Sequence, residues 1–316
     1  MQNLAHATKF PACSGPHPVQ KALGPTSKLT LVETINLHGV RVKCDSEDGQ
    51  LKKVLVHPPN FLSWTPDSAI NEVESTHQPP PISQVLMEHN LLVEALLGEG
   101  VDVIMVEPKP HLPEAVYQRD SIAVIGDRAF AAKFRFPVRQ GEINIISGAE
   151  SPWKRSDVVE FGDVLVFSDV VLVGISDRTN RNAAQTLDSH LDREIIQVPL
   201  KPGALHLDYT TTIGGRNGMR TMLACPELYS DQTSLPTLIS RLSIKNVIIV
   251  PKTDYANGWT NVFFINPETV ISTTASHDVN LQLKKLGFKV IELPFDGILT
   301  GQGAPRCCTA PLVRED

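Results

Sequence analysis

Short apolar runs alternate with polar segments along the chain, and their spacing predicts strands and helices in turn. Residues 51–57 are apolar enough for a first strand, and residues 101–106 for a second. Between them, residues 82–97 carry apolar side chains at helical spacing, and Gly98 ends this predicted helix. The intervening residues 64–81 are polar and rich in turn-forming types, which predicts a surface loop near the mouth of a site.

The same order of strand pair, helix and strand recurs along the rest of the chain. The predicted strand pairs are residues 121–134, 157–175, the flanks of 214–218, and 261–273. The helices and single strands predicted to follow the last three pairs are 181–191 with 194–198, 235–242 with 246–250, and 279–286 with 289–293. The final unit leads into a glycine- and proline-rich closing loop, residues 301–312.

Polar residues stand at matching places in these units. They are Asp120, Glu160, His206, Trp259 and Cys307, spaced roughly 40 to 50 residues apart. Repetition at this period predicts units arranged around a centre, although it also suits an open solenoid. Polar positions at the start of each strand pair favour the radial arrangement, because it brings them into one central pocket.

The sequence predicts a single domain over residues 29–316, since no linker rich in Gly, Ser or Pro divides it. Residues 1–28 contain no acidic residue and no apolar signal segment, and they are not Arg-rich. We expect a loosely ordered leader there, with an organellar import peptide as the alternative. The five cysteines are odd in number and scattered, which indicates free thiols and a cytoplasmic location.

Composition narrows the classes of partner. The chain has 316 residues, of which 41% are hydrophobic and 20% charged, as in ordinary globular proteins. The net charge of −6 and the lack of a basic stripe argue against a nucleic-acid partner. No apolar run approaches the roughly 18 residues that a membrane helix needs, so we expect no membrane partner. A homo-oligomer is compatible with the sequence.

Cys307 is the candidate nucleophile. A thiol in a Gly- and Pro-rich loop can approach a ligand closely, and Arg306 or a bound cation would favour the reactive thiolate. If the segment is extended, Cys308 faces the opposite side. The alternative is that both thiols are small buried hydrophobes.

His206 is the candidate acid and base, because imidazole titrates near neutral pH. Asp208 lies two residues on, so both side chains would share one face of a strand. Asp120 and Glu160 each stand among apolar neighbours, where a cationic ligand would compensate their burial. A salt bridge to a nearby arginine would do the same.

Two arginines and one aspartate complete the set. Arg139 and Arg178 are candidates for binding a substrate carboxylate through two parallel hydrogen bonds, or are solvated surface charges. Residues 177–180 also suit a helix start. Asp163 would fix the turn at Gly162.

Together these motifs resemble the guanidino-group-modifying enzymes, which include arginine deiminases, dimethylarginine dimethylaminohydrolases and amidinotransferases. The resemblance covers residues 51–316 and rests on five signals in the family's order. They are Arg119-Asp120, Glu160-x-Gly162-Asp163, Ser176-x-Arg178-Thr179-Asn180, His206-Leu207-Asp208 and Gly301-x-Gly303-x-x-Arg306-Cys307.

This resemblance implies an α/β fold, a five-bladed α/β propeller (pentein) of ββαβ-type repeats. It implies that Asp120, Glu160 and Asp208 bind a guanidinium group, and that Cys307 attacks its carbon. His206 would protonate the departing nitrogen and later activate water.

The resemblance also gives Arg139 and Arg178 the substrate carboxylate, and it implies neither a metal nor an organic cofactor. The chain has no room for the helical subdomain usual in arginine deiminases, and Phe161 replaces the second glycine of the usual acidic-Gly-Gly-Asp motif. Its compact length is closer to the dimethylarginine hydrolases.

The hypothesis is a cysteine-dependent hydrolase of a small-molecule guanidino substrate, L-arginine or an N-methylated arginine. The products would be citrulline with ammonia or a methylamine, formed through a covalent thiouronium intermediate. An amidinotransferase that passes the amidino group to an amine is one alternative. A non-catalytic binding module with the same fold is the other.

Overall fold

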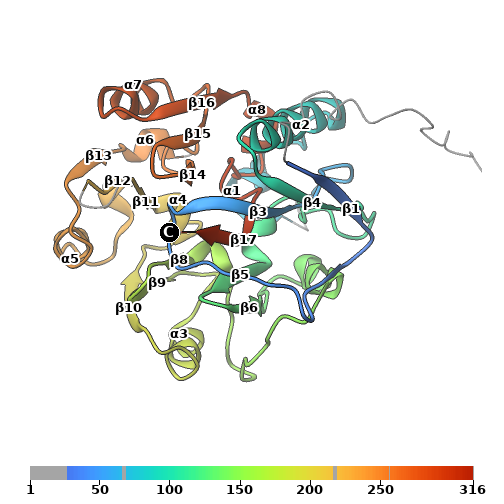
Figure 1. Ribbon diagram of the computed structural model, residues 1–316, viewed down its shortest axis with the longest axis horizontal. Coiled ribbons are helices and arrows are strands. Elements are labelled where there is room, and N and C mark those ends of the chain that lie inside the picture. Colours follow the sequence, from blue (N-terminus) through green and yellow to red (C-terminus); the bar gives the residue numbers. More distant parts are fainter. Residues whose placement is uncertain (1–26, 66–68, 216–218, 256, 316) are drawn as a thin grey trace, which may run out of the picture.

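Small β-sheets radiate from a common centre in the computed structural model, which describes residues 27–65, 69–215, 219–255 and 257–315 (Figure 1). This arrangement confirms the predicted five-bladed α/β propeller. Residues 1–26 of the expected leader lie outside the described residues. Of its last two, Ser27 donates a hydrogen bond to the carbonyl of Leu97 at 2.9 Å, and the Lys28 amide donates to Asp102 at 2.9 Å.

Three blades share one plan. An inner strand pairs antiparallel with a middle strand, and a helix then leads to an outer strand parallel to the middle one. Their strands are β8 (Val164–Val166), β9 (Val170–Ile175) and β10 (Glu194–Pro199); β11 (Thr211–Gly214), β12 (Thr221–Ala224) and β13 (Asn246–Ile249); and β14 (Phe263–Asn266), β15 (Thr269–Thr273) and β16 (Lys289–Leu293). Their helices are α3 (Arg181–Asp188), α5 (Ser234–Arg241) and α7 (His277–Lys285). Residues 216–218, in the expected turn between β11 and β12, lie outside the described residues.

The two ends of the described chain build a further blade together. The inner strand β17 (Ala310–Glu315) pairs antiparallel with β3 (Gln50–Val56), and β3 pairs parallel with β4 (Asp102–Val106). Helix α2 (Ile82–Gly98) connects β3 to β4, and β1 (Leu29–Val32) adds an outer edge. The closing segment was predicted as a loop to residue 312, which is wrong for its last part. The strand is buried almost throughout, but its sequence contains Pro311 and ends in the charged pair Arg314-Glu315, so it was not recognised as a strand.

The remaining blade has no outer helix. Strands β5 (Ile122–Ile125) and β6 (Arg128–Ala131) form its hairpin, within the predicted pair 121–134. The 3₁₀ helix η3 (Pro137–Ile145) and the small sheet of β2 (Ile35–Asn36) with β7 (Ile146–Ser147) follow instead. The other short helices are α1 (Glu72–Thr76), η2 (Gln118–Asp120), η4 (Phe161–Asp163), α4 (Leu207–Thr210), η5 (Pro226–Leu228), α6 (Lys252–Tyr255) and α8 (Asp296–Leu299).

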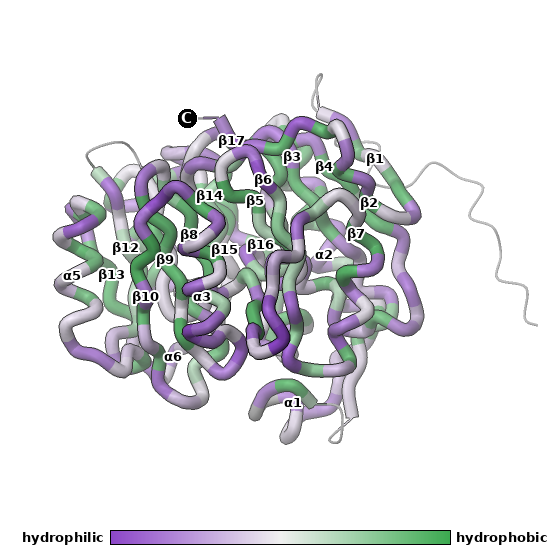
Figure 2. The backbone as a smooth tube through the Cα atoms, turned by 90° about the horizontal axis from the view of Figure 1, so that it is seen from below, coloured by the Kyte–Doolittle hydropathy of each residue, from purple (hydrophilic) through white to green (hydrophobic). Residues whose placement is uncertain are grey.

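Helix α1 lies inside the segment that was predicted as a loop, and it stands off one face of the ring (Figure 2). Asn71 accepts a hydrogen bond from the Glu74 amide at 2.8 Å, and Glu74 accepts one from the Ile70 amide at 2.8 Å. These local side-chain bonds start a helix too short to show an apolar periodicity. The C-terminal end of β17 lies at the opposite face of the ring (Figure 2).

Apolar packing joins the blades. Strands such as β9 are buried on both faces, which explains their unbroken apolar runs. One apolar cluster includes Leu51 of β3, Phe263 of β14 and Cys308 before β17, and so spans several blades. The single-domain assignment for residues 29–316 stays a prediction, and this shared cluster supports it. Within the described residues, no helix combines the length and apolarity needed to cross a membrane.

Strand β17 supplies a direct test of ring closure. Leu312 is fully buried between the first and last parts of the chain, so Leu312→Ala should lower the free energy of unfolding by about 2–5 kcal/mol. Leu31 on the edge strand β1 is 56% exposed, and Leu31→Ala should change it by less than about 0.5 kcal/mol. Urea unfolding of both variants measures the difference. Equal effects would show that β17 does not close the ring.

Candidate active site

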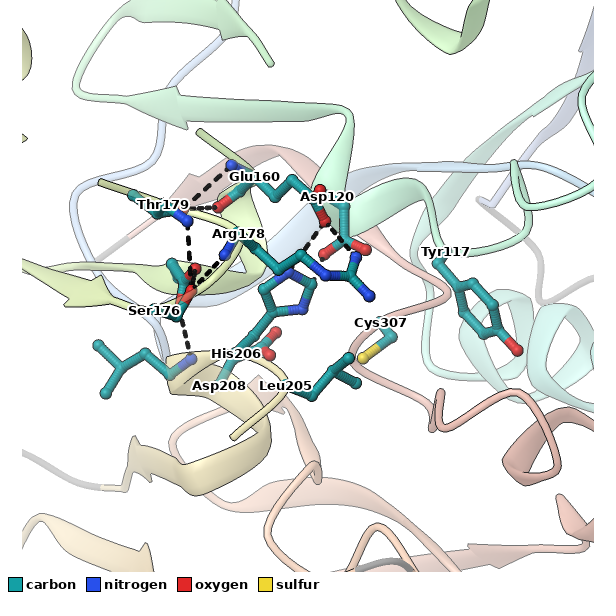
Figure 3. Close-up of polar contacts among 12 residues, drawn as sticks. Tyr117, Asp120, Glu160, Ser176, Arg178, Thr179, Leu205, His206, Asp208 and Cys307 are labelled. Atoms are coloured by element: carbon teal, nitrogen blue, oxygen red, sulfur yellow. Dashed lines mark hydrogen bonds and ion pairs between the residues drawn. The ribbon is translucent and has the colours of Figure 1, made fainter. Parts of the chain in front are cut away.

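Four of the five spaced polar residues meet at the centre of the ring. Asp120, Glu160, His206 and Cys307 each stand shortly before the inner strand of a blade, so the ring brings their side chains together (Figure 3). Asp208 joins them from the first turn of α4 (Figure 3). The fifth residue, Trp259, packs instead against an apolar cluster that its own blade shares with the preceding one.

His206 lies between two carboxylates. Its Nε2 is 3.0 Å from Glu160 Oε2, and its Nδ1 is 3.5 Å from Asp120 Oδ1. Burial alone would lower the pKa of the imidazole, but Asp120, Glu160 and Asp163 outweigh it and raise this pKa to about 9. The ring is therefore an imidazolium at neutral pH and can donate a proton.

Gly162 lets these groups come together. A Cβ atom on this residue would lie 2.6 Å from Asp120 Oδ1 and 2.7 Å from His206 Nδ1, which no side chain can do. The glycine of the Glu160-x-Gly162-Asp163 motif is thus required by close approach. Phe161, in place of a second glycine, is fully buried in the core of this blade.

Asp163 holds the histidine segment. Its Oδ1 accepts a hydrogen bond from the Leu207 amide at 2.8 Å, and its Oδ2 accepts one from Ser176 Oγ at 2.6 Å. The Ser176 hydroxyl in turn accepts from the amides of Arg178 and Thr179 (Figure 3). The sequence interpretation gave Asp163 only the turn at Gly162, whereas its carboxylate connects two blades. Burial raises its pKa to about 7.

Arg139 is buried and its donors are occupied. Nη1 donates to Asp120 Oδ2 at 2.6 Å, while Nε and Nη2 donate to Glu142 at 2.8 and 2.9 Å. Nη2 also reaches the carbonyl of Tyr117 at 3.2 Å, and the guanidinium lies over the ring of Phe134. Nη1 is also 3.6 Å from Glu160 Oε2. Arg139 is thus buried among carboxylates of the chain itself, and it does not line the outer cavity described below.

Arg178 lies at the mouth of the site. Its Nη1 donates to Glu160 Oε2 at 2.9 Å, and its Nη2 donates to the carbonyl of Ile70 at 2.5 Å. It thus connects Glu160 to the segment that carries α1. Burial opposes ionisation of Glu160, but Arg178 and His206 outweigh it and lower the pKa of this carboxyl to about 2.

Three buried carboxylate oxygens at the centre point to a missing cationic partner. Asp120 Oδ1, Glu160 Oε1 and Asp208 Oδ1 accept no hydrogen bond from any described residue. Such oxygens are costly unless a ligand donates to them. Asp120, Glu160 and His206 could also hold a metal ion, since one ligand atom of each lies within 4.8 Å of the others. A metal ion would have to displace the proton of His206, whereas a cation with N–H donors could bind to the carboxylate oxygens with the imidazolium in place.

Cys307 is fixed through its backbone. Its amide donates to Asn261 Oδ1 at 3.2 Å, and its carbonyl accepts from the Arg119 amide at 3.0 Å. Burial and the neighbouring charges of Asp208 and Asp120 raise the pKa of the Cys307 thiol well above its ordinary value. Without a bound cation the sulfur is therefore a neutral thiol.

Arg306 was expected to favour the thiolate of Cys307, but its guanidinium is hydrogen-bonded to the carboxylates of Asp208 and Glu47. Nε donates to Asp208 Oδ2 at 3.1 Å and Nη1 to Glu47 Oε2 at 2.6 Å. Burial raises the pKa of the Cys308 thiol too, and the charges of Glu88 of α2 and Asp120 add to this effect. Asp208 influences the Cys307 thiol in addition to Asp120, whereas the larger charge effect on Cys308 comes from Glu88, outside the centre.

The closing loop needs its glycines for packing. A Cβ atom on Gly303 would lie 1.9 Å from the ring of Tyr117, and one on Gly301 would lie 2.2 Å from its hydroxyl. The Tyr117 hydroxyl donates to the carbonyl of Ile298 at 3.1 Å. The loop is therefore held against the segment before Asp120 and is not a free hinge.

A cavity of about 560 Å³ opens outside the centre. Its lining includes the apolar Leu205 and Phe136, and the cations Arg178, Arg135 and Lys252. Sequence reasoning missed Arg135 and Lys252, since isolated basic residues are usually solvated.

Sequence reasoning also missed Asn261, whose amide oxygen accepts a hydrogen bond from the Cys307 amide. Asn261 begins the fourth strand pair, the position that holds polar residues in the other blades. A stricter alignment of the repeats would have found it two residues after Trp259.

Comparison with known proteins places the chain in a family. The family described as N,N dimethylarginine dimethylhydrolase, eukaryotic, matches residues 58–314. The chain belongs to the guanidino-group-modifying superfamily. It is 33% identical over 281 residues to the uncharacterized protein YkgA of Bacillus subtilis (strain 168), which covers 86% of this chain and 95% of that protein.

The chain is also similar to an arginine deiminase in sequence and to a solved structure in fold. An arginine deiminase of Limosilactobacillus fermentum is 28% identical over 255 residues, covering 65% of this chain and 62% of that enzyme. The fold matches the product-bound N-terminal domain of ArgZ, a cyanobacterial arginine dihydrolase, with a TM-score of 0.72 and 22% identity. That match covers 84% of this chain and 98% of that chain.

The charge state of His206 is open to direct measurement. Because its pKa in the folded protein is about 9, the imidazole should stay protonated at neutral pH in ¹⁵N-resolved NMR. Its contribution to stability should be complete below about pH 6.5 and be lost as pH rises through about 9. Glu160→Gln removes one neighbouring charge and should lower this pKa. A His206 signal that titrates near pH 6.5 in the wild type would contradict this electrostatic picture.

Proposed function

We propose that the protein hydrolyses the guanidino group of L-arginine or an N-methylated arginine, releasing citrulline with ammonia or a methylamine. The observation that carries the proposal is the set of three buried carboxylate oxygens, on Asp120, Glu160 and Asp208, that lack hydrogen-bond donors. A guanidinium is flat and presents N–H groups in several directions, so one group can donate to all three. Family membership supports the same chemistry.

Binding of the substrate cation would activate the nucleophile. The Cys307 thiol is held neutral by burial and by the charges of Asp208 and Asp120. A guanidinium on those carboxylates neutralises their charge, so the thiol can release its proton to solvent and become a thiolate. The reactive sulfur then forms only when substrate is present.

The proposed reaction has two halves. The Cys307 thiolate attacks the guanidinium carbon, and the His206 imidazolium gives its proton to the departing nitrogen, which leaves as ammonia or an amine. A cationic thiouronium remains on the sulfur. Water then attacks the same carbon while neutral His206 takes a proton from it, and the C–S bond breaks to release the ureido product and the thiolate. The second water proton leaves on the released amine.

The remainder of the substrate would occupy the outer cavity. We assign its carboxylate to Arg178, as the family resemblance implies, together with Arg135, because both guanidinium groups line that cavity. Arg178 would then leave Glu160 when substrate enters. For Arg139 we propose a different role from the one the sequence gave, that of positioning Asp120 and Glu142 from behind.

The hydrolase remains our choice over two alternatives, an amidinotransferase and a non-catalytic binding module. Water suffices as the acceptor here, and the gathered Cys307, His206 and carboxylates would have no use in a module that only binds. The cytoplasmic location, and assembly into a homo-oligomer, stay predictions.

Product analysis tests the proposal. Wild-type protein should release citrulline from arginine, monomethylarginine or dimethylarginine, and Cys307→Ser should retain less than about one thousandth of this rate. Cys308→Ser is the matched control and should stay within about a few-fold of wild type. Release of citrulline by Cys307→Ser together with loss in Cys308→Ser would reverse the nucleophile assignment. No citrulline from any substrate, with transfer to an added amine, would favour the transferase.

The two arginine roles separate in kinetics. Arg135→Gln should raise KM by roughly 10- to 100-fold with little change in kcat, since a charged hydrogen bond to the bound substrate is lost. Arg139→Gln should lower kcat and also destabilise the fold by roughly 3–5 kcal/mol, because it leaves buried Asp120 and Glu142 without their cation. Steady-state kinetics and urea unfolding measure both. If Arg139→Gln raised KM without lowering kcat or stability, Arg139 would instead bind the substrate carboxylate, as the sequence predicted.

A further inference from the structure

A second cluster of arginines is buried behind Cys307, where the mechanism makes no use of it. Arg119, Arg306 and Arg314 are only 7%, 1% and 2% exposed. Arg306 forms ion pairs with two carboxylates, Glu47 and Asp208. The other two arginines have no ion-pair partner within the described part of the chain.

None of the hydrogen bonds that these two guanidinium groups make within the described residues has an ionised acceptor. Arg314 donates from Nη1 to the carbonyl of Gly49 at 2.6 Å and from Nη2 to that of Phe264 at 2.7 Å, and both acceptors are neutral. The Nε and Nη2 atoms of Arg119 are buried and have no hydrogen-bond partner among the described residues. Both guanidinium groups flank the ring of Phe263, at 5.8 and 5.3 Å from its centre.

Nearby acidic groups attract these two arginines but form no ion pair with them within the described residues. Glu47 lines the same cavity, but its oxygens already accept from Arg306 and from the Val166 amide at 2.7 Å. Burial raises the pKa of the Cys44 thiol to about 12, so this sulfur is neutral. Asp48 interacts with Arg220 and Arg314, but it does not line the small cavity that adjoins Arg119 and Arg314.

Of these two arginines, Arg119 has the guanidinium whose protonated form is clearly disfavoured by its surroundings. Burial, with repulsion from Arg306 and Arg314, outweighs the attraction of Glu47 and Asp208 and lowers the pKa of the Arg119 guanidinium to about 9. Burial also lowers the pKa of Arg314. Burying a cation without an ion-pair partner has an unfavourable desolvation free energy, and an anion within hydrogen-bond distance would offset most of it.

A cavity of about 20 Å³ adjoins both guanidinium groups. Cys44, Ser46 and Glu47 line it together with Arg119 and Arg314, and apolar side chains complete the wall. This volume admits a single particle about the size of a water molecule or a halide ion. Sulfate, phosphate and organic anions are too large for it.

We propose that this cavity binds one small monovalent anion of the size of chloride, between Arg119 and Arg314. The anion accepts hydrogen bonds from the unpartnered N–H groups of Arg119. It also steadies the segment that holds the nucleophile, because the Arg119 amide donates to the carbonyl of Cys307. The site is distinct from the one proposed for hydrolysis, since the lining of this cavity includes none of the residues to which we assign the substrate or the chemistry.

Bromide gives a direct test on the wild-type protein. Crystals grown with sodium bromide should show an anomalous peak in this cavity, within about 3.5 Å of Arg119 nitrogen atoms. Replacing sodium gluconate with sodium chloride at equal ionic strength should raise Tm by roughly 3–6 °C. A cavity without bromide, or bromide only elsewhere on the protein, would overturn the proposal, as would equal Tm values in the two salts.

A pair of variants ties the effect to the cluster. Arg119→Gln should abolish the Tm difference between chloride and gluconate. Arg241→Gln removes an arginine that pairs with Asp169 and Glu194 on the surface, and it should keep the full difference. A full chloride effect in folded Arg119→Gln would contradict the site. If Arg119→Gln does not fold, the bromide peak in the wild type decides.

Discussion

Buried charge is the constraint on which the centre of this ring depends. Asp120, Glu160 and Asp208 lie where water cannot solvate them, so each needs a cationic partner. Arg139, Arg178 and Arg306 supply part of the compensation from the chain itself. The carboxylate oxygens that accept no hydrogen bond from the described residues indicate a ligand that is a cation with N–H donors. This inference does not depend on the role of Cys307.

The ring turns distant sequence into one site. Each inner strand begins near the centre, so a polar residue placed just before it enters the same small volume as its counterparts. Glycines make this crowding feasible: Gly162 admits His206 against Asp120, and Gly303 admits Tyr117. The motif glycines therefore serve close packing, and alanine at either position would clash with groups of the candidate site or its supporting loop.

The sequence predicted the repeated units and the family well, because both depend on local patterns and on spacing. It missed β17 and α1, because Pro311 interrupts an apolar run and because five residues are too few to show a period. It identified Asp120, Glu160, His206 and Cys307 as chemical candidates. Spacing along the sequence could not show that Arg139 is bonded to Asp120 and Glu142, or that Arg135 lines the outer cavity. Both facts depend on the direction in which each side chain leaves its segment.

The central claim is that a guanidinium group donates hydrogen bonds to the three carboxylate oxygens of Asp120, Glu160 and Asp208 that accept none from the described residues. A crystal structure of Cys307→Ala with L-arginine tests it most directly, since the attacking sulfur is absent and the carboxylates are intact. We expect guanidino nitrogen atoms within about 3.2 Å of Asp120, Glu160 and Asp208, with Arg178 displaced from Glu160. Arginine bound with its guanidino group elsewhere, while these oxygens stay unpartnered, would contradict the account.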